Sequence, residues 1–266
     1  MIERSTHNDV TAYRLSWWRS RAIGYSVNVY VVRGVLIDSG FPAAQHDVAQ
    51  LVKAEQVRGA YITHQHEDHA GNAAWLAHHG VPLAMADATY ESIRHPHRIG
   101  LYRHVTWRAM RPLSSPFARL VDEGFALLPT PGHSPDHHAV FDTQTNTLFA
   151  GDLFLGVKVR HGHSYESPRA TVASLRDMIA RAPLRVFCAH RGLLPNGTAM
   201  LEAKARWMED AIARVETMAR EGARVGTIRD EVLGKRDSTH WISAGDYSPD
   251  NLVRAIARDA GIAVRA

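Results

Sequence analysis

Short apolar stretches alternate with amphipathic ones along the first two thirds of the chain, and this pattern predicts how the fold begins. Residues 25–32 and 35–38 are β-prone, and Arg33-Gly34 between them is typical of a tight hairpin turn. Residues 43–54 repeat apolar side chains at helical spacing. We therefore expect a β-hairpin at the start of a sheet, followed by an amphipathic helix.

The same alternation continues to about residue 190 and predicts α/β layering. The further strands expected are 60–63, 81–85, 125–128, 138–141, 147–150 and 184–189. The further helices expected in this part are 72–79, 86–91 and 168–180, the last capped by Ser167.

The pattern changes after Pro195, where helical stretches follow one another without strands. Residues 199–221 form a long helical run, Thr227 is a candidate cap for a helix over 227–233, and Ser248-Pro249 begins a last helix. We expect a domain over 1–195 and a helical extension over 196–266 that packs on it. The apolar positions of this extension would cover the sheet, form a homodimer surface or line a substrate cleft.

Composition limits the classes of protein that the chain can represent. The 266 residues are 45% hydrophobic, which is enough for one large domain or for a domain with an extension. No apolar run approaches the roughly 20 residues of a membrane span, and MIERSTHNDV has no signal-peptide core. The single cysteine, Cys188, excludes an internal disulfide and a cysteine-rich zinc site. These features favour a cytoplasmic protein without a membrane partner.

The basic charge of the chain is concentrated in one segment. The net charge is +4 and the sequence pI is about 9.4, yet residues 92–121 contain six arginines and no acidic residue. We expect a basic insert whose Arg98, Arg103 and Arg108 attract an anionic small-molecule substrate, with an ordinary solvated helix as the alternative. Because no nucleic-acid-binding motif accompanies this charge, a nucleic-acid partner is not favoured.

Histidine and aspartate gather directly after the apolar run 60–63. In an extended segment alternate side chains share a face, so His64 and His66 can chelate one ion, and Asp68 and His69 continue toward a second. The alternative is a polar surface loop in a chain that holds 17 histidines. The full HxHxDH pattern behind a predicted strand favours the metal site.

The stretch THQHEDHAG at residues 63–71 resembles the signature of the metallo-β-lactamase superfamily, and the other motifs of that family follow in order. They are LIDSG at 36–40, TPGHSP at 130–135, FAGD at 149–152 and VFCAHRG at 186–192. The resemblance covers about two thirds of the chain, from residue 25 to 192. It implies the α/β fold of that family, a four-layer αβ/βα sandwich, here with a C-terminal helical extension.

The resemblance also implies a binuclear metal site. His64, His66 and His133 would hold one metal, Asp68, His69 and His190 the other, and Asp152 would bridge them. Asp38 would support the metal loop from behind the ligands. Two zinc ions suit these imidazole and carboxylate ligands, and iron or manganese are also permitted. The neighbouring His137 and His138 are expected to be loop residues or supports of the ligands.

The chemistry expected from such a site is hydrolysis. Two cations about 3.5–4 Å apart can share a hydroxide and polarise a carbonyl or phosphoryl oxygen, with Asp68 as a ligand that also orients the nucleophile or accepts its proton. The chain has Asp152 where the largest class of secreted β-lactamases has a cysteine, so it resembles the glyoxalase II, lactonase and ribonuclease Z branches more closely. A small ester, thioester or lactone is the substrate expected.

Two alternatives stay open from the sequence. The basic pI favours a phosphodiesterase or nuclease of the same fold. A sulfur dioxygenase of the same fold would use one iron held by two histidines and Asp152.

Overall fold

The structure is a computed structural model that describes residues 1–265, and within it the chain forms two compact units. The first comprises residues 1–129, 136–152 and 184–194, and the second comprises residues 130–135, 153–183 and 195–266. Residues 153–183 thus group with the C-terminal helices. The division of the chain into a domain over 1–195 and an extension over 196–266 stays a prediction.

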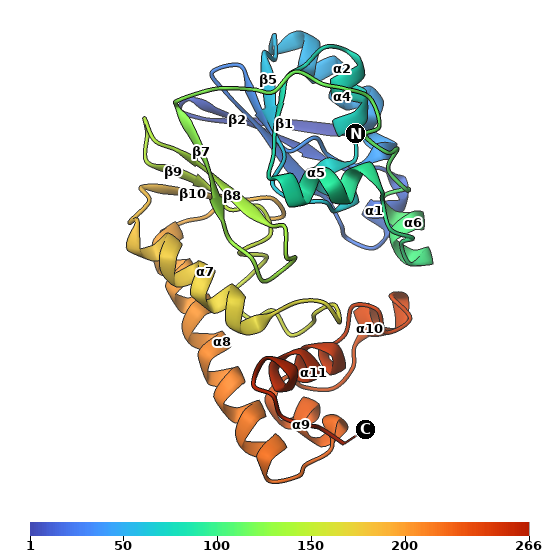
Figure 1. The fold of residues 1–266 in the computed structure, drawn as a ribbon, viewed down its shortest axis with the longest axis vertical. Helices are drawn as coiled ribbons and strands as arrows, with labels where there is room; N and C mark the ends of the chain where they lie inside the picture. The colour runs from blue at the N-terminus through green and yellow to red at the C-terminus, as the bar shows by residue number, and fades with distance from the viewer. Residues whose placement is uncertain (266) are drawn as a thin grey trace. The chain divides into compact units, whose positions relative to one another are not determined.

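The first sheet belongs to the first unit and has six strands in sequence order (Figure 1). They are β1 Ile2–His7, β2 Val10–Leu15, β3 Val27–Val32, β4 Val35–Ile37, β5 Gly59–Tyr61 and β6 Leu83–Ala84. The β3–β4 hairpin is confirmed, because Val32 pairs with Val35 around Arg33 and Gly34. Both turn residues have positive φ, at 49° and 75°, as a type I′ turn requires.

The expectation that residues 25–32 open the sheet is wrong, because β1 and β2 precede them. β1 is an edge strand whose residues are exposed or half-buried, so the sequence IERSTH lacks the apolar alternation that marks a half-buried strand. It pairs with β2 as a hairpin, from Ile2–Leu15 to His7–Val10, with only Asn8 and Asp9 between the two strands.

The second sheet also belongs to the first unit and has five strands in the order β11-β10-β9-β8-β7. They are β7 Phe125–Pro129, β8 His138–Asp142, β9 Thr147–Phe149, β10 Arg185–Cys188 and β11 Gly192–Leu193. The two sheets enclose an apolar core in which the rings of Tyr30, Phe149 and Phe187 lie 5.2–5.4 Å apart. This burial, at about 25 cal/mol per Å² of apolar surface, holds the sheets together.

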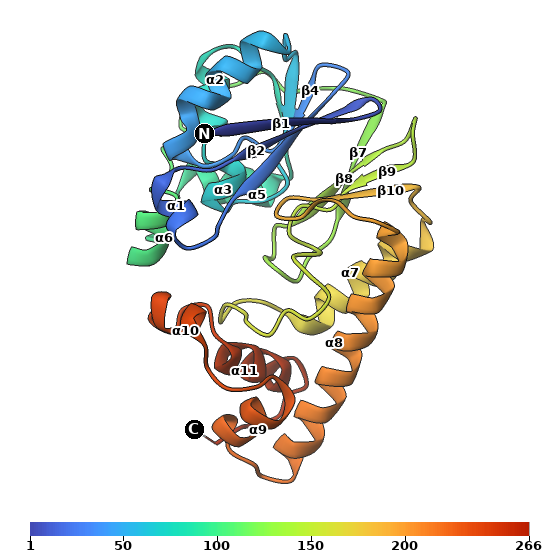
Figure 2. The ribbon, with the colours of Figure 1, turned by 180° about the vertical axis from the view of Figure 1, so that it is seen from behind.

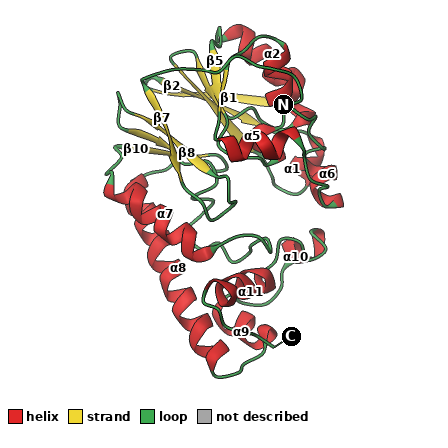
Figure 3. Cartoon of the chain, viewed as in Figure 1, coloured by secondary structure: helices red, strands yellow, loops and turns green. Residues whose placement is uncertain are grey.

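The second face of the first sheet is covered by another apolar core that includes Leu36, Phe41, Val48 and Leu76. Short helices accompany this sheet (Figure 3). They are α1 Trp18–Ala22, α2 Gln45–Ala54, α3 Glu67–Ala70, α4 Ala73–His78, α5 Asp87–Arg94 and α6 Leu101–Thr106, with a 3₁₀ turn at Pro42–Ala44. The predicted layering of helices and strands is therefore present in this unit.

The regular elements of the second unit, over its described residues, are helices joined by loops (Figure 2). It contains α7 Pro168–Ala180, α8 Gly197–Arg220, α9 Val225–Val232, α10 Ser238–Ile242 and α11 Pro249–Asp259. Ser167 caps α7 as predicted, since its hydroxyl accepts a hydrogen bond from the Ala170 N–H at 3.2 Å. The prediction that Thr227 caps α9 is wrong, because buried Val225 already begins the helix and its N-cap is Arg224.

The core of the second unit comes from α8, α9 and α11. Val215, Ile228 and Val253 are fully buried in it. Within residues 1–265, no helix combines the length and the hydropathy that crossing a membrane requires.

Candidate metal centre

Parallel strand pairs bring the candidate ligands to one edge of each sheet. β4 runs parallel to β5 with Ile37 beside Tyr61, and β9 runs parallel to β10 with Phe149 beside Phe187. The residues that follow such strands emerge at the same edge, so Asp38 and the loop beginning at Ile62 leave the first sheet together. Gly151-Asp152 and Ala189-His190 leave the second sheet in the same way.

Main-chain bonds join these two edges within the first unit. The His138 N–H donates to the Thr63 carbonyl at 2.9 Å, and the Asn28 N–H donates to the Ala189 carbonyl at 2.6 Å. The Tyr30 hydroxyl donates to the Cys188 carbonyl at 2.6 Å. The loops that carry the histidines are therefore attached to both sheets.

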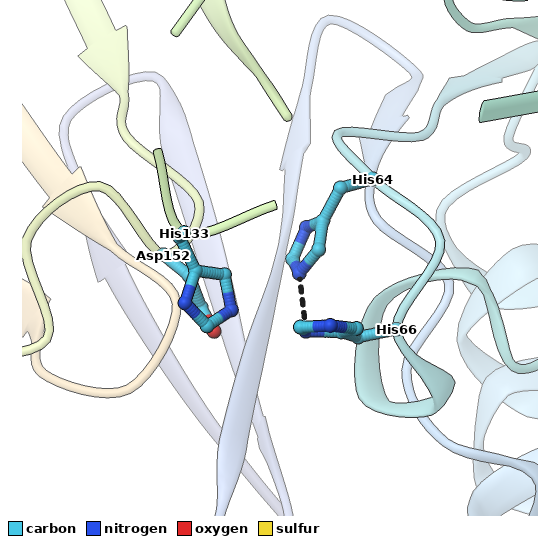
Figure 4. A group of neighbouring side chains, drawn as sticks. All are labelled: His64, His66, His133 and Asp152. Carbon is cyan, nitrogen blue, oxygen red and sulfur yellow. Dashed lines mark hydrogen bonds between the residues drawn. The ribbon is translucent and has the colours of Figure 1, made fainter. Parts of the chain in front are cut away.

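The first group of candidate ligands includes His64 and His66, whose ring centres lie 4.5 Å apart in an edge-on arrangement. His64 Nε2 lies 3.0 Å from His66 Nδ1 (Figure 4). Together with His133 and Asp152, each offers one ligand atom, and these atoms lie within 4.8 Å of one another. All four side chains are buried. The extended segment at 64–66 thus places both imidazoles on one side, as its alternation predicts.

The second group consists of Asp68, His69 and His190, whose ligand atoms also lie within 4.8 Å of one another. Asp68 Oδ2 is 3.9 Å from His69 Nε2 and 3.4 Å from His190 Nε2. Asp152 Oδ1 lies 3.3 Å from each of these two nitrogens. Asp152 therefore lies beside the second group as well as in the first.

Asp38 lies behind the histidines and fixes the orientation of two of them. Its carboxylate accepts hydrogen bonds from the Thr63 N–H at 2.8 Å, from the Thr63 hydroxyl at 2.9 Å and from His69 Nδ1 at 2.7 Å. Because the Thr63 hydroxyl gives its hydrogen to Asp38, it accepts from His64 Nδ1, which is 3.0 Å away. The Nε2 atoms of both His64 and His69 are then left as acceptors.

The backbone of Asp38 is strained. Its φ is +60°, in the left-handed region that non-glycine residues seldom occupy. The Asp38 N–H donates to the Tyr61 carbonyl at 2.8 Å, which holds this conformation at the end of β4. Strain of this kind persists where the surrounding structure over-determines a residue, and functional sites are a common place for it.

The donor set fits divalent metal ions. His69 Nε2 is buried and has no hydrogen-bond partner among residues 1–265, while its Nδ1 is held by Asp38. An imidazole held at one nitrogen by a carboxylate and presenting the other is the usual arrangement of a metal-bound histidine. His190 repeats it, since its Nδ1 donates to the Ser26 carbonyl at 2.8 Å. The His/Asp cluster therefore has the chemistry of a metal site.

The cluster also perturbs the proton affinities of its members. Burial and the neighbouring His69 and His66 hold the pKa of His64 well below its ordinary value. Burial lowers the pKa of His190, but the Asp152 and Asp68 carboxylates outweigh it and raise that pKa to about 9. Below about pH 9 a cation that binds to His190 must therefore displace a proton.

Two further side chains support the site: Asp136, which was not predicted, and His137, which was expected to be a loop residue or a support of the ligands. The Asp136 carboxylate accepts a hydrogen bond from the Gln65 N–H at 2.8 Å and so fixes the loop between His64 and His66. His137 Nε2 accepts from the Asp152 N–H at 3.0 Å. The only sequence signal was their position just after the predicted ligand His133, and it does not distinguish a support from an ordinary loop residue.

The three arginines expected to meet substrate lie in different environments. Arg98 is exposed, and the Arg108 guanidinium lies 5.1 Å from the centre of the Trp17 ring. Arg103 donates from Nε and Nη2 to Oε2 of buried Glu67, at 2.9 and 2.6 Å. A role of these side chains in substrate binding stays a prediction.

Comparison with known protein families identifies the fold. The family model described as the metallo-beta-lactamase superfamily matches residues 22–190. The chain belongs to the metallo-beta-lactamase superfamily. The matched range contains every predicted ligand, and the two-sheet architecture with its helices is the αβ/βα sandwich of this family.

Solved structures of this superfamily share the fold at low sequence identity. A beta-lactamase domain protein from Burkholderia ambifaria has a TM-score of 0.69 at 18% identity, over 97% of this chain and 88% of its own. A metallo-beta-lactamase family protein from Thermus thermophilus has a TM-score of 0.66 at 16% identity, over 97% of this chain and 95% of its own.

Curated relatives are similar over part of their length. The uncharacterized protein YobT of Bacillus subtilis is 28% identical over 49% of this chain and 63% of its own length. A hydroxyacylglutathione hydrolase of Thiobacillus denitrificans is 29% identical over 61% of this chain and 58% of its own length. An atrochrysone carboxyl ACP thioesterase of Aspergillus fumigatus is 26% identical over 75% and 46%. This chain thus spans about half to two thirds of the length of these relatives.

Proposed function

We propose that this chain is a metal-dependent hydrolase that binds two divalent cations, zinc in the first instance, and cleaves a small ester, thioester or lactone. The observation that carries the proposal is the pair of adjoining ligand groups, His64, His66, His133 and Asp152 beside Asp68, His69 and His190. Two relatives whose names state thioester substrates, a hydroxyacylglutathione hydrolase and an ACP thioesterase, favour the thioester among the three bonds.

Different residues of the chain would orient the ligands and transfer the proton. When bound, two divalent cations supply Lewis acidity for the carbonyl and lower the pKa of water toward neutrality. Asp38 holds His69, and through Thr63 also His64, with Nε2 presented to the site. Asp68, whose Oδ2 lies 3.4 Å from His190 Nε2, would accept the proton of the attacking water and return it to the leaving group.

An anionic substrate would suit the surroundings of the site. Residues 92–121 carry no acidic side chain, and Arg98 and Arg111 within them are exposed. A positive surface of this kind raises the local concentration of anions and the rate of their association, and added salt weakens the effect. A thioester that carries a carboxylate or a phosphate combines the negative charge with the bond that the relatives favour.

The test is metal removal and reconstitution against a panel of substrates. Protein treated with a chelator is expected to lose at least about 100-fold in kcat/KM for its best thioester or lactone, and added zinc is expected to restore it. His69→Ala should show the same loss, while His78→Ala, on the exposed face of α4, should keep full activity.

Elemental analysis of the purified protein separates the alternatives. Near two ions per chain supports the proposal, whereas a single iron with oxygen consumption would support a dioxygenase. Preferential cleavage of phosphodiesters would support a nuclease, and full activity after complete metal removal would overturn metal-dependent hydrolysis altogether.

A further inference from the structure

Glu67 lies within the ligand run but belongs to neither group of candidate ligands. It is the first residue of α3, between His66 and Asp68, and only 4% of it is exposed. An ionised carboxylate at such a position is costly to bury without a partner. It would also compete for a cation, because it adjoins two candidate ligands in the chain.

Arg103 is the partner of this carboxylate. Its Nε and Nη2 both donate to Glu67 Oε2, at 2.9 and 2.6 Å, from a position 36 residues further along the chain. The two side chains are 13% and 5% exposed, so the ion pair is largely shielded from solvent. A charge-assisted pair in this environment is held more firmly than a surface salt bridge.

The helix that carries Arg103 is itself anchored to the core of the first unit. The Trp107 N–H donates to the Arg103 carbonyl at 2.7 Å, and the buried Trp107 ring lies 4.9 Å from Phe41. On the other side, Trp17 Nε1 donates to the Thr106 carbonyl at 2.5 Å. The guanidinium is therefore attached to packed structure although its segment is rich in exposed arginines.

We infer that Arg103 is a positioning residue of the metal site, which holds the ligand loop through Glu67 and keeps the Glu67 carboxylate out of the ligand set. The inference rests on the proposed function only in that the site must bind divalent metal. It gives one arginine of the basic segment a role distinct from that of its exposed neighbours.

The physical reason is the precision that a metal site requires. His66 and Asp68 are bonded through the chain to Glu67, so any movement of Glu67 displaces a candidate ligand on each side. Ligand geometry must be kept within roughly 0.5 Å for tight binding. Partners that orient metal ligands from outside the ligand set typically change metal affinity by about 10–100-fold when they are removed.

The experiment measures metal affinity in the full-length protein, with zinc as the probe in a competition titration. Arg103→Met keeps the aliphatic stem and removes the charge, and it is expected to weaken zinc binding by about 10–100-fold. Arg103→Lys should recover part of this loss. Arg111→Met is the matched control, because Arg111 is an exposed arginine of the same segment, and its zinc affinity should equal that of the unmodified protein.

A double-variant comparison tests whether Arg103 acts through Glu67. If it does, Arg103→Met should have little further effect on zinc affinity in a Glu67→Gln background. Cobalt-substituted protein adds a spectroscopic readout, since displaced ligands alter the visible absorption bands. Should Arg103→Met fail to fold by circular dichroism, Glu67→Gln alone decides, and an unchanged zinc affinity and cobalt spectrum in it would overturn the inference.

Other results would also overturn the inference. One is an unchanged zinc affinity in a folded Arg103→Met. Another is a loss of zinc affinity on Arg103→Met that is equal in the unmodified protein and in the Glu67→Gln background. A third is a rise in KM for anionic substrates with metal affinity intact. The last result would assign Arg103 to substrate binding. Failure of the proposed function is distinguishable, because a protein that binds zinc but cleaves no ester, thioester or lactone still reports the affinity change.

Discussion

The Asp38 carboxylate lies 2.7 Å from His69 Nδ1 and holds this imidazole from a backbone in the left-handed region. Asp38→Ala should therefore weaken zinc binding by about 10–100-fold, since His69 loses its orientation and Thr63 loses its acceptor. Zinc competition titrations measure this directly. Asp177→Ala, at an exposed position of α7, is the control, and equal affinities for the two variants would contradict the role of Asp38.

Metal binding should strengthen as the pH rises. Burial lowers the pKa of His190, but the Asp152 and Asp68 carboxylates together outweigh it and raise that pKa to about 9, so below that pH the metal-free site carries a proton that a cation must displace. Each displaced proton weakens binding by about tenfold per pH unit below the pKa. Calorimetric titration of zinc in buffers of different ionisation enthalpy reports the proton release. A zinc affinity that stays constant from about pH 6 to about pH 9 would contradict the prediction.

An ion pair between the buried Asp142, at the far end of β8, and the more exposed Arg33 should contribute to stability. The Asp142 carboxylate accepts from Arg33 Nη1 and Nη2 at 2.9 and 2.8 Å, and also from the Thr145 hydroxyl at 2.7 Å. Asp142→Asn should lower the free energy of unfolding by about 2 kcal/mol at neutral pH, as expected for hydrogen bonds to a charged group. Chemical denaturation measures this loss. Glu123→Gln, on a neighbouring exposed residue, should change stability little.

The stabilisation by Asp142 should depend on pH with a definite sign. Burial alone would raise the pKa of Asp142, but the hydrogen bonds from Arg33 and Thr145 outweigh it and hold the pKa below its ordinary value. A depressed pKa in the folded state contributes stability above the unfolded pKa of about 4 and loses it as the pH falls further. The difference in the free energy of unfolding between the unmodified protein and Asp142→Asn should shrink in that acidic range. A difference that grows there would contradict the assignment.

Gly151 allows the second sheet to present Asp152. Its φ is +49°, and a Cβ at this position would lie 2.7 Å from His137 Nε2, the acceptor of the Asp152 N–H. Gly151→Ala should cost about 1–2 kcal/mol for the backbone conformation alone, and displacement of His137 should add to it and weaken zinc binding. Gly80→Ala is the control, since Gly80 has a φ of +76° with no atom within 4 Å of a Cβ. Equal losses of stability in the two variants would show that His137 is displaced without cost.

Local sequence patterns predicted many of the elements and the ligand run at residues 64–69, whereas His133, Asp152 and His190 were assigned through the family resemblance. The Arg33-Gly34 turn, the apolar run before His64 and the cap at Ser167 each act over a few residues, so their physical preference is readable without the rest of the fold. The HxHxDH run is also a local pattern, because His64 and His66 share a side of an extended segment whatever surrounds it.

The tertiary structure decided which charged groups meet. Nothing in the neighbourhood of Arg103 marks it as the partner of Glu67, and nothing near Asp38 identifies His69 as the ring that it holds. A guanidinium or a carboxylate finds its partner through the packing of distant elements, and the cost of burying it alone selects that partner only once the fold has formed. β1 was not predicted for a different reason, since an exposed edge strand gains its place by pairing with β2 and not by burying an apolar face of its own.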